Sequence, residues 1–165
     1  MKKAAVIMGS VNDMPVVEKT VEVLKSFEIP VTVRVLSAHR TPDEVSAFSK
    51  SARENGYGVI IAAAGMAAHL AGAVAAQTPL PVVALPLKSK ALEGLDALLA
   101  TVMMPPGVPV AAVGIDCAQN AGYLAAQILA VEDSALAEKY GDFKRNQYRK
   151  CIDADNETRA RMNTL

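Results

Sequence analysis

The stretch that decides the fold is Val31-Thr32-Val33-Arg34-Val35-Leu36-Ser37-Ala38-His39-Arg40-Thr41-Pro42-Asp43-Glu44. Residues 31–36 are mostly apolar, alternate in polarity and are rich in β-branched side chains, which predicts a strand. The end of the stretch carries helix start signals. Thr41 supplies a capping hydroxyl, Pro42 suits the first turn, and Glu44 would complete a capping box. A strand that leads at once into a capped helix is the repeating unit of α/β proteins, so the stretch predicts that fold class.

His39 and Arg40 lie in the short link between this strand and this helix. In parallel α/β folds the ligand binds outside the carboxyl ends of the strands, which is where the link falls. An imidazole exchanges a proton near neutral pH, and a guanidinium offers a fork of donors to a phosphate or carboxylate. His39, one of two histidines in the chain, is therefore a candidate acid–base residue. The alternative is a histidine with only a packing or surface role.

The rest of the chain repeats the strand–helix pattern. Apolar runs predict strands over 4–8, 31–36, 59–63, 82–85 and 110–113, and helical periodicity predicts helices over 15–27, 41–55, 67–77, 92–102 and 120–130. Gly56 would close the second helix as a C′ residue. We predict a three-layer α/β fold, a doubly wound parallel five-stranded sheet in the flavodoxin-like order 2-1-3-4-5.

Residues 134–165 form a different, charged tail. We predict a helix over 134–152 that breaks near Gly141, followed by a polar segment over 153–165 that could fray. No linker precedes the tail, so we assign 1–133 to a flavodoxin-like domain and 134–165 to a helical extension of that domain. The tail could extend from the globule onto a neighbouring subunit.

The loops at 9–13, 37–41 and 65–69 follow the first three strands and should meet at the switch point of such a sheet. The first, Gly9-Ser10-Val11-Asn12-Asp13, presents backbone N–H groups and short polar side chains at a helix start, which suits a phosphate. Asp13 suits a ribose hydroxyl or, equally, the N-cap of the first helix. His69, in the third loop, points toward the same place, although it could instead satisfy a buried backbone group.

Other loop residues could line the site or serve structure alone. Lys88, Ser89 and Lys90 follow the fourth strand and would either add positive charge to a pocket or form a solvated loop. Asn120 is most simply the cap of the fifth helix. The rigid, apolar run 103–107 would wall a pocket or form a subunit contact.

The composition argues against several classes of function. Lys and Arg together number 17, as do Asp and Glu, and aromatic residues are few, so nucleic-acid binding is not expected. Cys117 and Cys151 lack metal-site spacing and are typical of reduced thiols. The isolated cysteines predict a protein without a metal site. Reduced thiols and the lack of a predicted signal peptide together predict a cytoplasmic protein. The apolar stretch 59–76 is interrupted by glycines and has no nearby Lys or Arg, which favours a buried strand and helix over a membrane span.

Several common sites are missing from the sequence. Neither a P-loop nor a nucleophilic serine elbow is present. The third strand ends in alanines 62–64 with no aspartate, so a phospho-acceptor receiver domain is excluded, and no aromatic residue in the switch-point loops could stack on a flavin. Hydrophobic residues make up 52% of the chain, which is high for a small monomer and predicts subunit interfaces.

The switch-point loops resemble those of one family. The motifs are Met8-Gly9-Ser10-Val11-Asn12-Asp13, Ser37-Ala38-His39-Arg40-Thr41-Pro42, Ala64-Gly65-Met66-Ala67-Ala68-His69-Leu70 and Met104-Pro105-Pro106-Gly107-Val108-Pro109-Val110. They are similar to the signatures of the PurE family of purine biosynthesis over about residues 4–132. Ala-Ala-His-Leu in the third loop resembles the class I branch, the N5-carboxyaminoimidazole ribonucleotide mutases. The branch that carboxylates aminoimidazole ribonucleotide with free CO2 usually has Ser followed by Asn or Asp there.

This resemblance implies an isomerase that moves a carboxylate from N5 to C4 of the imidazole by releasing, trapping and re-adding CO2. His39 would protonate the departing nitrogen and later accept the C4 proton. Ser10, Ser37 and Arg40 would hold the 5′-phosphate, and Asp13 the ribose. The other substrate-binding positions that the resemblance implies are Asn12, Ala38, Gly65, Met66, Ala67, His69 and Leu70. It also implies no cofactor and a homo-octamer with active sites near subunit contacts.

Some residues depart from the family pattern. Met66 replaces a glycine whose backbone approaches the base, and a positive φ there would strain a methionine. The other differences are Asn12 for serine, Ala71 for proline, Ala97 for serine and Met103 for glutamine. They leave two alternatives to the mutase. One is a paralogous carboxylase or decarboxylase acting on another heteroaromatic ribonucleotide, including aminoimidazole ribonucleotide with CO2. The other is a non-catalytic nucleotide-binding module.

Overall fold

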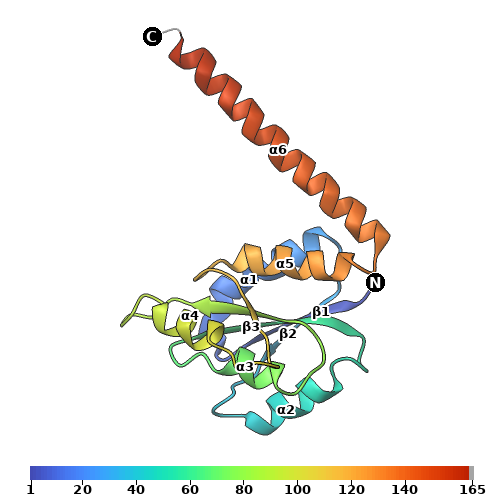
Figure 1. The fold of residues 1–165 in the computed structure, drawn as a ribbon, viewed down its shortest axis with the longest axis vertical. Helices are drawn as coiled ribbons and strands as arrows, with labels where there is room; N and C mark the ends of the chain where they lie inside the picture. Colours follow the sequence, from blue (N-terminus) through green and yellow to red (C-terminus); the bar gives the residue numbers. More distant parts are fainter. Residues whose placement is uncertain (164–165) are drawn as a thin grey trace.

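A five-stranded, all-parallel sheet in the order β2-β1-β3-β4-β5 forms the centre of the computed structural model, which describes residues 1–163 (Figure 1). The strands are β1 (Lys3–Met8), β2 (Val31–Val35), β3 (Tyr57–Gly65), β4 (Val82–Leu87) and β5 (Ala111–Ala112). The predicted strand order is confirmed, and the first strand lies between the second and the third. The switch point therefore falls between β1 and β3, where the chain turns to build the sheet in the other direction.

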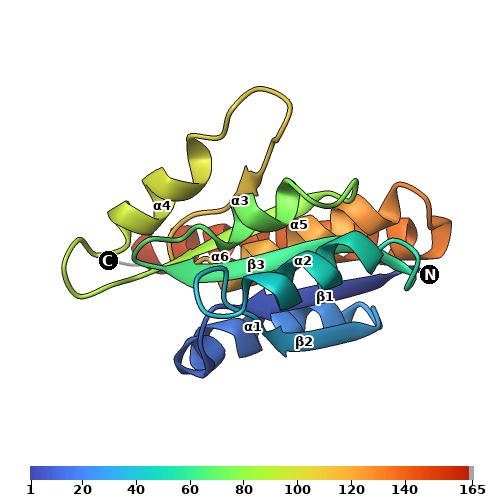
Figure 2. The same cartoon turned by 90° about the horizontal axis from the view of Figure 1, so that it is seen from below.

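Helices cover both faces of the sheet, giving the three layers predicted (Figures 1 and 2). They are the 3₁₀ turn η1 (Val11–Asp13) and the helices α1 (Met14–Ser26), α2 (Pro42–Ser51), α3 (Leu70–Ala75), α4 (Leu95–Val102), α5 (Ala118–Ala130) and α6 (Ser134–Met162). The strand period of two sorts the side chains of β1: Val6 and Met8 pack with α1 and α5, whereas Ala5 and Ile7 pack with α2 and α3. Because both faces are covered, the central strands are apolar throughout.

Three predicted helix starts are corrected. The fourth helix begins at Leu95 rather than at residue 92. The third helix begins at Leu70 rather than at residue 67, because residues 66–69 form two tight turns instead. In these turns the N–H of Ala68 donates to the carbonyl of Met66 at 2.9 Å, and that of His69 donates to Ala67 at 2.8 Å. The fifth helix begins at Ala118, two positions early, so Asn120 is not its cap. No helix within residues 1–163 combines the length and apolarity needed to cross a membrane.

The C-terminal tail is a continuous helix, α6 (Ser134–Met162), that projects away from the rest of the molecule (Figure 1). The predicted break near Gly141 is wrong, and residues 153–162 are helical. Residues 164–165, at the end of the segment predicted to fray, lie outside the described residues. Aromatic contacts hold the base of α6: Phe27 lies 5.6 Å from Tyr140 and 5.7 Å from Phe143 between ring centroids. These contacts flank Gly141 and outweigh the roughly 1 kcal/mol helix penalty of a glycine.

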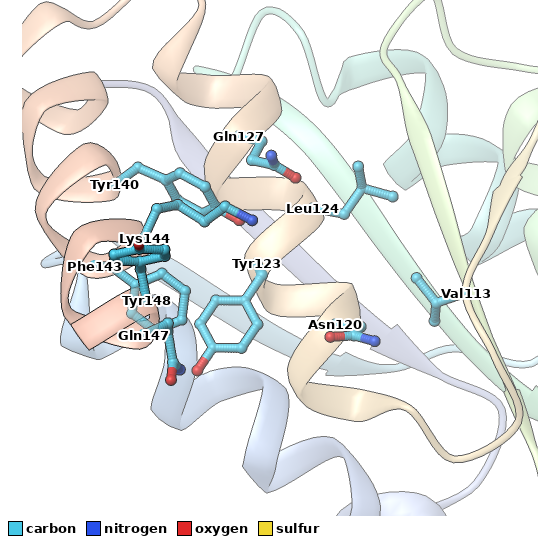
Figure 3. A pocket seen from close by; sticks show the side chains of 10 residues that line it. All are labelled: Val113, Asn120, Tyr123, Leu124, Gln127, Tyr140, Phe143, Lys144, Gln147 and Tyr148. Carbon is cyan, nitrogen blue, oxygen red and sulfur yellow. The ribbon is translucent and has the colours of Figure 1, made fainter. Parts of the chain in front are cut away.

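A groove of about 640 Å³ runs between α5 and the base of α6. Figure 3 shows Tyr140, Phe143 and Tyr148 of α6 facing Tyr123 and Gln127 of α5. None of the residues that line this groove belongs to the loops at 9–13, 37–41 or 65–69. The groove is therefore a feature of the α6 attachment and is separate from the switch point.

Candidate active site

The three switch-point loops meet at the carboxyl edge of the sheet. Nε2 of His39, after β2, lies 2.9 Å from Nδ1 of His69, after β3. The two rings are edge to face, with centroids 5.0 Å apart and planes at 82°. Nη2 of Arg40 donates to the carbonyl of Gly9, after β1, at 2.5 Å. The convergence predicted from topology is thus confirmed by direct contacts between side chains of one loop and groups of the other two.

The loop after β1 is closed by its own polar groups. The N–H of Ser10 donates to Oδ2 of Asp13 at 3.1 Å, and the N–H of Asn12 donates to Oγ of Ser10 at 3.2 Å. Asp13 occupies the N-cap position of α1, but its carboxylate makes no cap bond to that helix. Burial raises the pKa of the Asp13 carboxyl, while the Ser10 N–H and the Arg40 charge act in the opposite direction. The Asp13 carboxylate thus lies within the influence of the Arg40 charge.

The loop after β2 corrects the role predicted for Thr41. Thr41 does sit at the N-cap of α2, and Pro42 does open the helix, but the Thr41 side chain makes no bond to the helix and no capping box forms with Glu44. The Thr41 hydroxyl instead bonds to the backbone of Ser37. In turn Oγ of Ser37 accepts from the backbone N–H of Arg40 at 3.2 Å and from its Nε at 3.3 Å. Helix start signals in the sequence could not distinguish these two uses of one hydroxyl.

The loop after β3 holds a strained residue. Met66 has φ of +55°, in the left-handed region that favours glycine, so the conformation that would strain it is present. Its side chain is 69% exposed. The preceding Gly65 lies against β4, since a Cβ there would stand 3.3 Å from the carbonyl oxygen of Leu87. This strained turn places the His69 imidazole beside that of His39.

The remaining predicted positions differ in what they can offer a ligand. His39, Arg40, Asn12, Ala67 and His69 are exposed. Ser10, Ser37, Ala38 and Gly65 are half-buried. Leu70 is 2% exposed and its side chain lies in the core beside α2 and β3, so its backbone is the part nearer the edge.

The loop after β4 uses its polar groups internally. Lys88 forms an ion pair with Glu93, and its backbone N–H donates to Oδ1 of Asp116 at 2.9 Å. Ser89 donates to the carboxylate of Asp96. In the run 103–107, Met104 packs on α3, because a Cβ on Gly72 would lie 3.3 Å from its sulfur. These contacts favour a structural role for Lys88, Ser89 and Met104.

The edge combines a guanidinium, hydroxyls and backbone amides beside two imidazoles. Among residues 1–163, no group of three or more His, Cys, Asp or Glu side chains is placed to hold a metal ion. The first set of groups binds anions, and the imidazoles accept and donate protons. Groups of this kind at the switch point of a doubly wound α/β fold are suited to bind a small anionic ligand.

The chain belongs to the AIR carboxylase family, whose model matches residues 3–150. It is 49% identical over 149 residues to the N5-carboxyaminoimidazole ribonucleotide mutase of Pyrococcus abyssi, covering 90% of this chain and 86% of that one. It is 48% identical over 141 residues to a chloroplastic phosphoribosylaminoimidazole carboxylase of Vigna aconitifolia, covering 86% of this chain and 25% of that one. The crystal structure of Treponema denticola PurE matches with a TM-score of 0.86 at 29% identity, covering 93% and 96% of the two chains.

Proposed function

We propose that this protein is an N5-carboxyaminoimidazole ribonucleotide mutase, an isomerase of purine biosynthesis that moves the substrate carboxylate from N5 to C4. The observation that carries the proposal is the His39–His69 pair, 2.9 Å apart, beside an arginine that bridges two of the three loops. The arrangement supplies a proton carrier next to an anion site, and an intramolecular carboxylate shift on a nucleotide needs both.

The reaction balances with one proton carrier. In the first step the bond from N5 to the carboxylate carbon breaks, CO2 forms, and protonated His39 gives a proton to N5. In the second step C4 attacks the retained CO2, and the C4 proton passes to the now neutral His39. The enzyme ends in its starting state and no co-substrate is consumed, because substrate and product are isomers. One histidine serves both steps because an imidazole can donate and then accept at similar pH.

The binding roles come from the family resemblance, and the bonds of Arg40 to Ser37 and Gly9 support them. Arg40, with Ser10 and Ser37, is proposed to hold the 5′-phosphate, and Asp13 the ribose. Asn12, Ala38, Gly65, Met66, Ala67, His69 and Leu70 are proposed to surround the base and its carboxylate. CO2 must be kept from solvent between the steps, and the alanine- and glycine-rich third loop suits a small, dry enclosure.

A second candidate is carboxylation of aminoimidazole ribonucleotide with free CO2, the activity named for the plant relative. Ala67-Ala68-His69-Leu70 in the third loop favours the mutase, since the CO2-using branch usually carries Ser with Asn or Asp there. The two are separated by supplying either N5-carboxyaminoimidazole ribonucleotide or aminoimidazole ribonucleotide with bicarbonate. We expect turnover of the first at limiting bicarbonate, together with rescue of a purine auxotroph that lacks the mutase. Turnover of only the second pair would replace the proposal.

We also propose a homo-oligomer larger than a dimer, an octamer by family resemblance, acting in the cytoplasm. Exposed apolar side chains on and around α4 support self-association because they fall at helical spacing: Leu92, Leu95, Leu99, Val102 and Met103, each 44–80% exposed. Light scattering should give a mass above that of a dimer, and Leu95→Lys with Leu99→Lys should lower it. A stable, active monomer at micromolar concentration contradicts this assembly.

A further inference from the structure

The hydroxyl of Thr41 bonds to the chain before it rather than to the helix that follows. An N-cap threonine ordinarily accepts from N–H groups two or three residues ahead. Here the N–H of Ser37 donates to Oγ1 of Thr41 at 2.9 Å, and that hydroxyl donates back to the carbonyl of Ser37 at 3.2 Å. The same carbonyl also accepts from the N–H of Thr41 at 2.9 Å. Both backbone polar groups of Ser37 are therefore bound by one residue.

The bonds between Thr41 and Ser37 also affect the side chains that would contact a ligand. With its backbone fixed, Ser37 turns Oγ toward Arg40 and accepts two N–H bonds from it. Its lone pairs are then engaged, and its hydroxyl hydrogen can still donate to a ligand. Arg40 uses Nε on Ser37 and one Nη2 hydrogen on Gly9, so three of its five N–H groups remain for an anion. The order of dependence runs from Thr41 to Ser37 and then to Arg40.

We propose that Thr41 is a positioning residue that pre-organises Ser37 and Arg40 for the substrate phosphate. The inference rests on the proposed function in that it takes a phosphate to be the anion bound there. The physical reason is entropic. The loop is exposed, and an arginine side chain that is ordered before binding loses less freedom when the anion arrives. Without the clamp, that ordering is deferred to the binding step and affinity falls.

The test compares Thr41→Val, which keeps the shape and removes the hydroxyl, with Thr41→Ser, which keeps the hydroxyl. The first measurement is the dissociation constant of inorganic phosphate by calorimetry on the intact protein. We expect about a tenfold weaker constant for Thr41→Val, the effect of a net loss near 1.4 kcal/mol, and nearly wild-type binding for Thr41→Ser. Thr41→Ala should bind phosphate as weakly as Thr41→Val, and it replaces that variant in the test if Thr41→Val does not fold.

The matched control is Thr78→Val. Thr78 also accepts a backbone N–H, from Leu80 at 3.3 Å, but it precedes β4 at the opposite edge of the sheet. Its removal should leave phosphate affinity unchanged.

The second measurement is steady-state turnover of N5-carboxyaminoimidazole ribonucleotide. Thr41→Val should raise KM by the same factor as the phosphate constant, with a smaller change in kcat. Equal phosphate affinity in Thr41→Val and wild type overturns the proposal, as does a loss in Thr41→Ser as large as in Thr41→Val. Phosphate binding needs no turnover, so the Thr41 result stands apart from any failure of the mutase assay.

Discussion

Nε2 of His39 and Nδ1 of His69 lie 2.9 Å apart although the residues are 30 positions apart in the chain. A hydrogen bond between two ring nitrogens needs one that carries a proton and one that does not, so the rings hold complementary tautomers. The outer nitrogen of the accepting ring already carries a proton, so a further proton that leaves the bond intact goes to the outer nitrogen of the donating ring. A proton on both facing nitrogens breaks it. The pair is therefore suited to hold one extra proton, which is what a single-proton shuttle requires.

Replacing the two histidines separately should reveal which one moves the proton. His39→Asn should fold and bind nucleotide, because the side chain is exposed, yet lose about 10²–10⁴-fold in kcat, the range of general acid–base catalysis. His69→Asn should cost less, since we place His69 beside the base and its carboxylate and assign the proton transfer to His39. Turnover of N5-carboxyaminoimidazole ribonucleotide by both variants is the measurement. Near-wild-type turnover in His39→Asn with a dead His69→Asn would reverse the assignment.

Removing the Arg40 guanidinium should weaken substrate binding. Arg40→Ala deletes both a charge-assisted donor for the phosphate and the bridge to Gly9, so we expect a loss of about 2–3 kcal/mol in binding free energy. Arg40→Lys keeps the positive charge but loses the forked donor, so its substrate affinity should lie between those of wild type and Arg40→Ala. KM for the substrate reports the effect. An unchanged KM in Arg40→Ala would count decisively against the phosphate role.

The Asp13 carboxyl should make stability depend on pH in a defined direction. Burial, the largest influence, raises its pKa above the ordinary 3.8, so the folded state holds this proton more tightly than the unfolded state. The stabilisation from this group is present below the unfolded pKa and is lost as pH rises through the folded pKa. Asp13→Asn keeps an acceptor for the Ser10 N–H and removes the charge.

Thermal unfolding from pH 3.5 to 7 therefore checks Asp13→Asn against wild type. The variant should be the more stable at pH 7, and its advantage should shrink toward pH 3.5. Glu18→Gln, an exposed carboxylate on α1, is the control and should run parallel to wild type. An Asp13→Asn advantage that is constant across the range would show that charge burial is not the cause.

Met66 should cost stability through its backbone. The left-handed conformation of Met66 costs an ordinary residue roughly 1–2 kcal/mol of stability, and glycine avoids this cost. A glycine also gains freedom in the unfolded chain, which lowers stability by about 0.5–1 kcal/mol. Met66→Gly should therefore raise the free energy of unfolding by about 0.5–1 kcal/mol. Met66→Ala keeps the penalty and should show no such gain. Denaturant unfolding of the three proteins measures this, and a gain in the alanine variant equal to that in glycine would point to the side chain instead.

The fold could be predicted from local pattern because each strand and helix carries its own period. The alternation in Val31–Val35 and the continuous apolar run of β3 predicted two strands, and the predicted topology placed the loops of His39 and His69 together. Two features could not be predicted locally. The hydroxyl of Thr41 had two backbone partners within reach, and only the loop geometry selects Ser37. The continuity of α6 through Gly141 depends on Phe27, which lies far away in the sequence.

The central claim is that one closed site moves a carboxylate from N5 to C4 without releasing it. The most direct test is turnover of N5-carboxyaminoimidazole ribonucleotide labelled with ¹³C in its carboxylate, in buffer with unlabelled bicarbonate. Carbon NMR of the product should show the label at the C4 carboxylate, because CO2 formed in the first step is recaptured before it escapes. Product that carries unlabelled carboxylate, with the label found in bicarbonate, would contradict the account and indicate a carboxylase that uses free CO2.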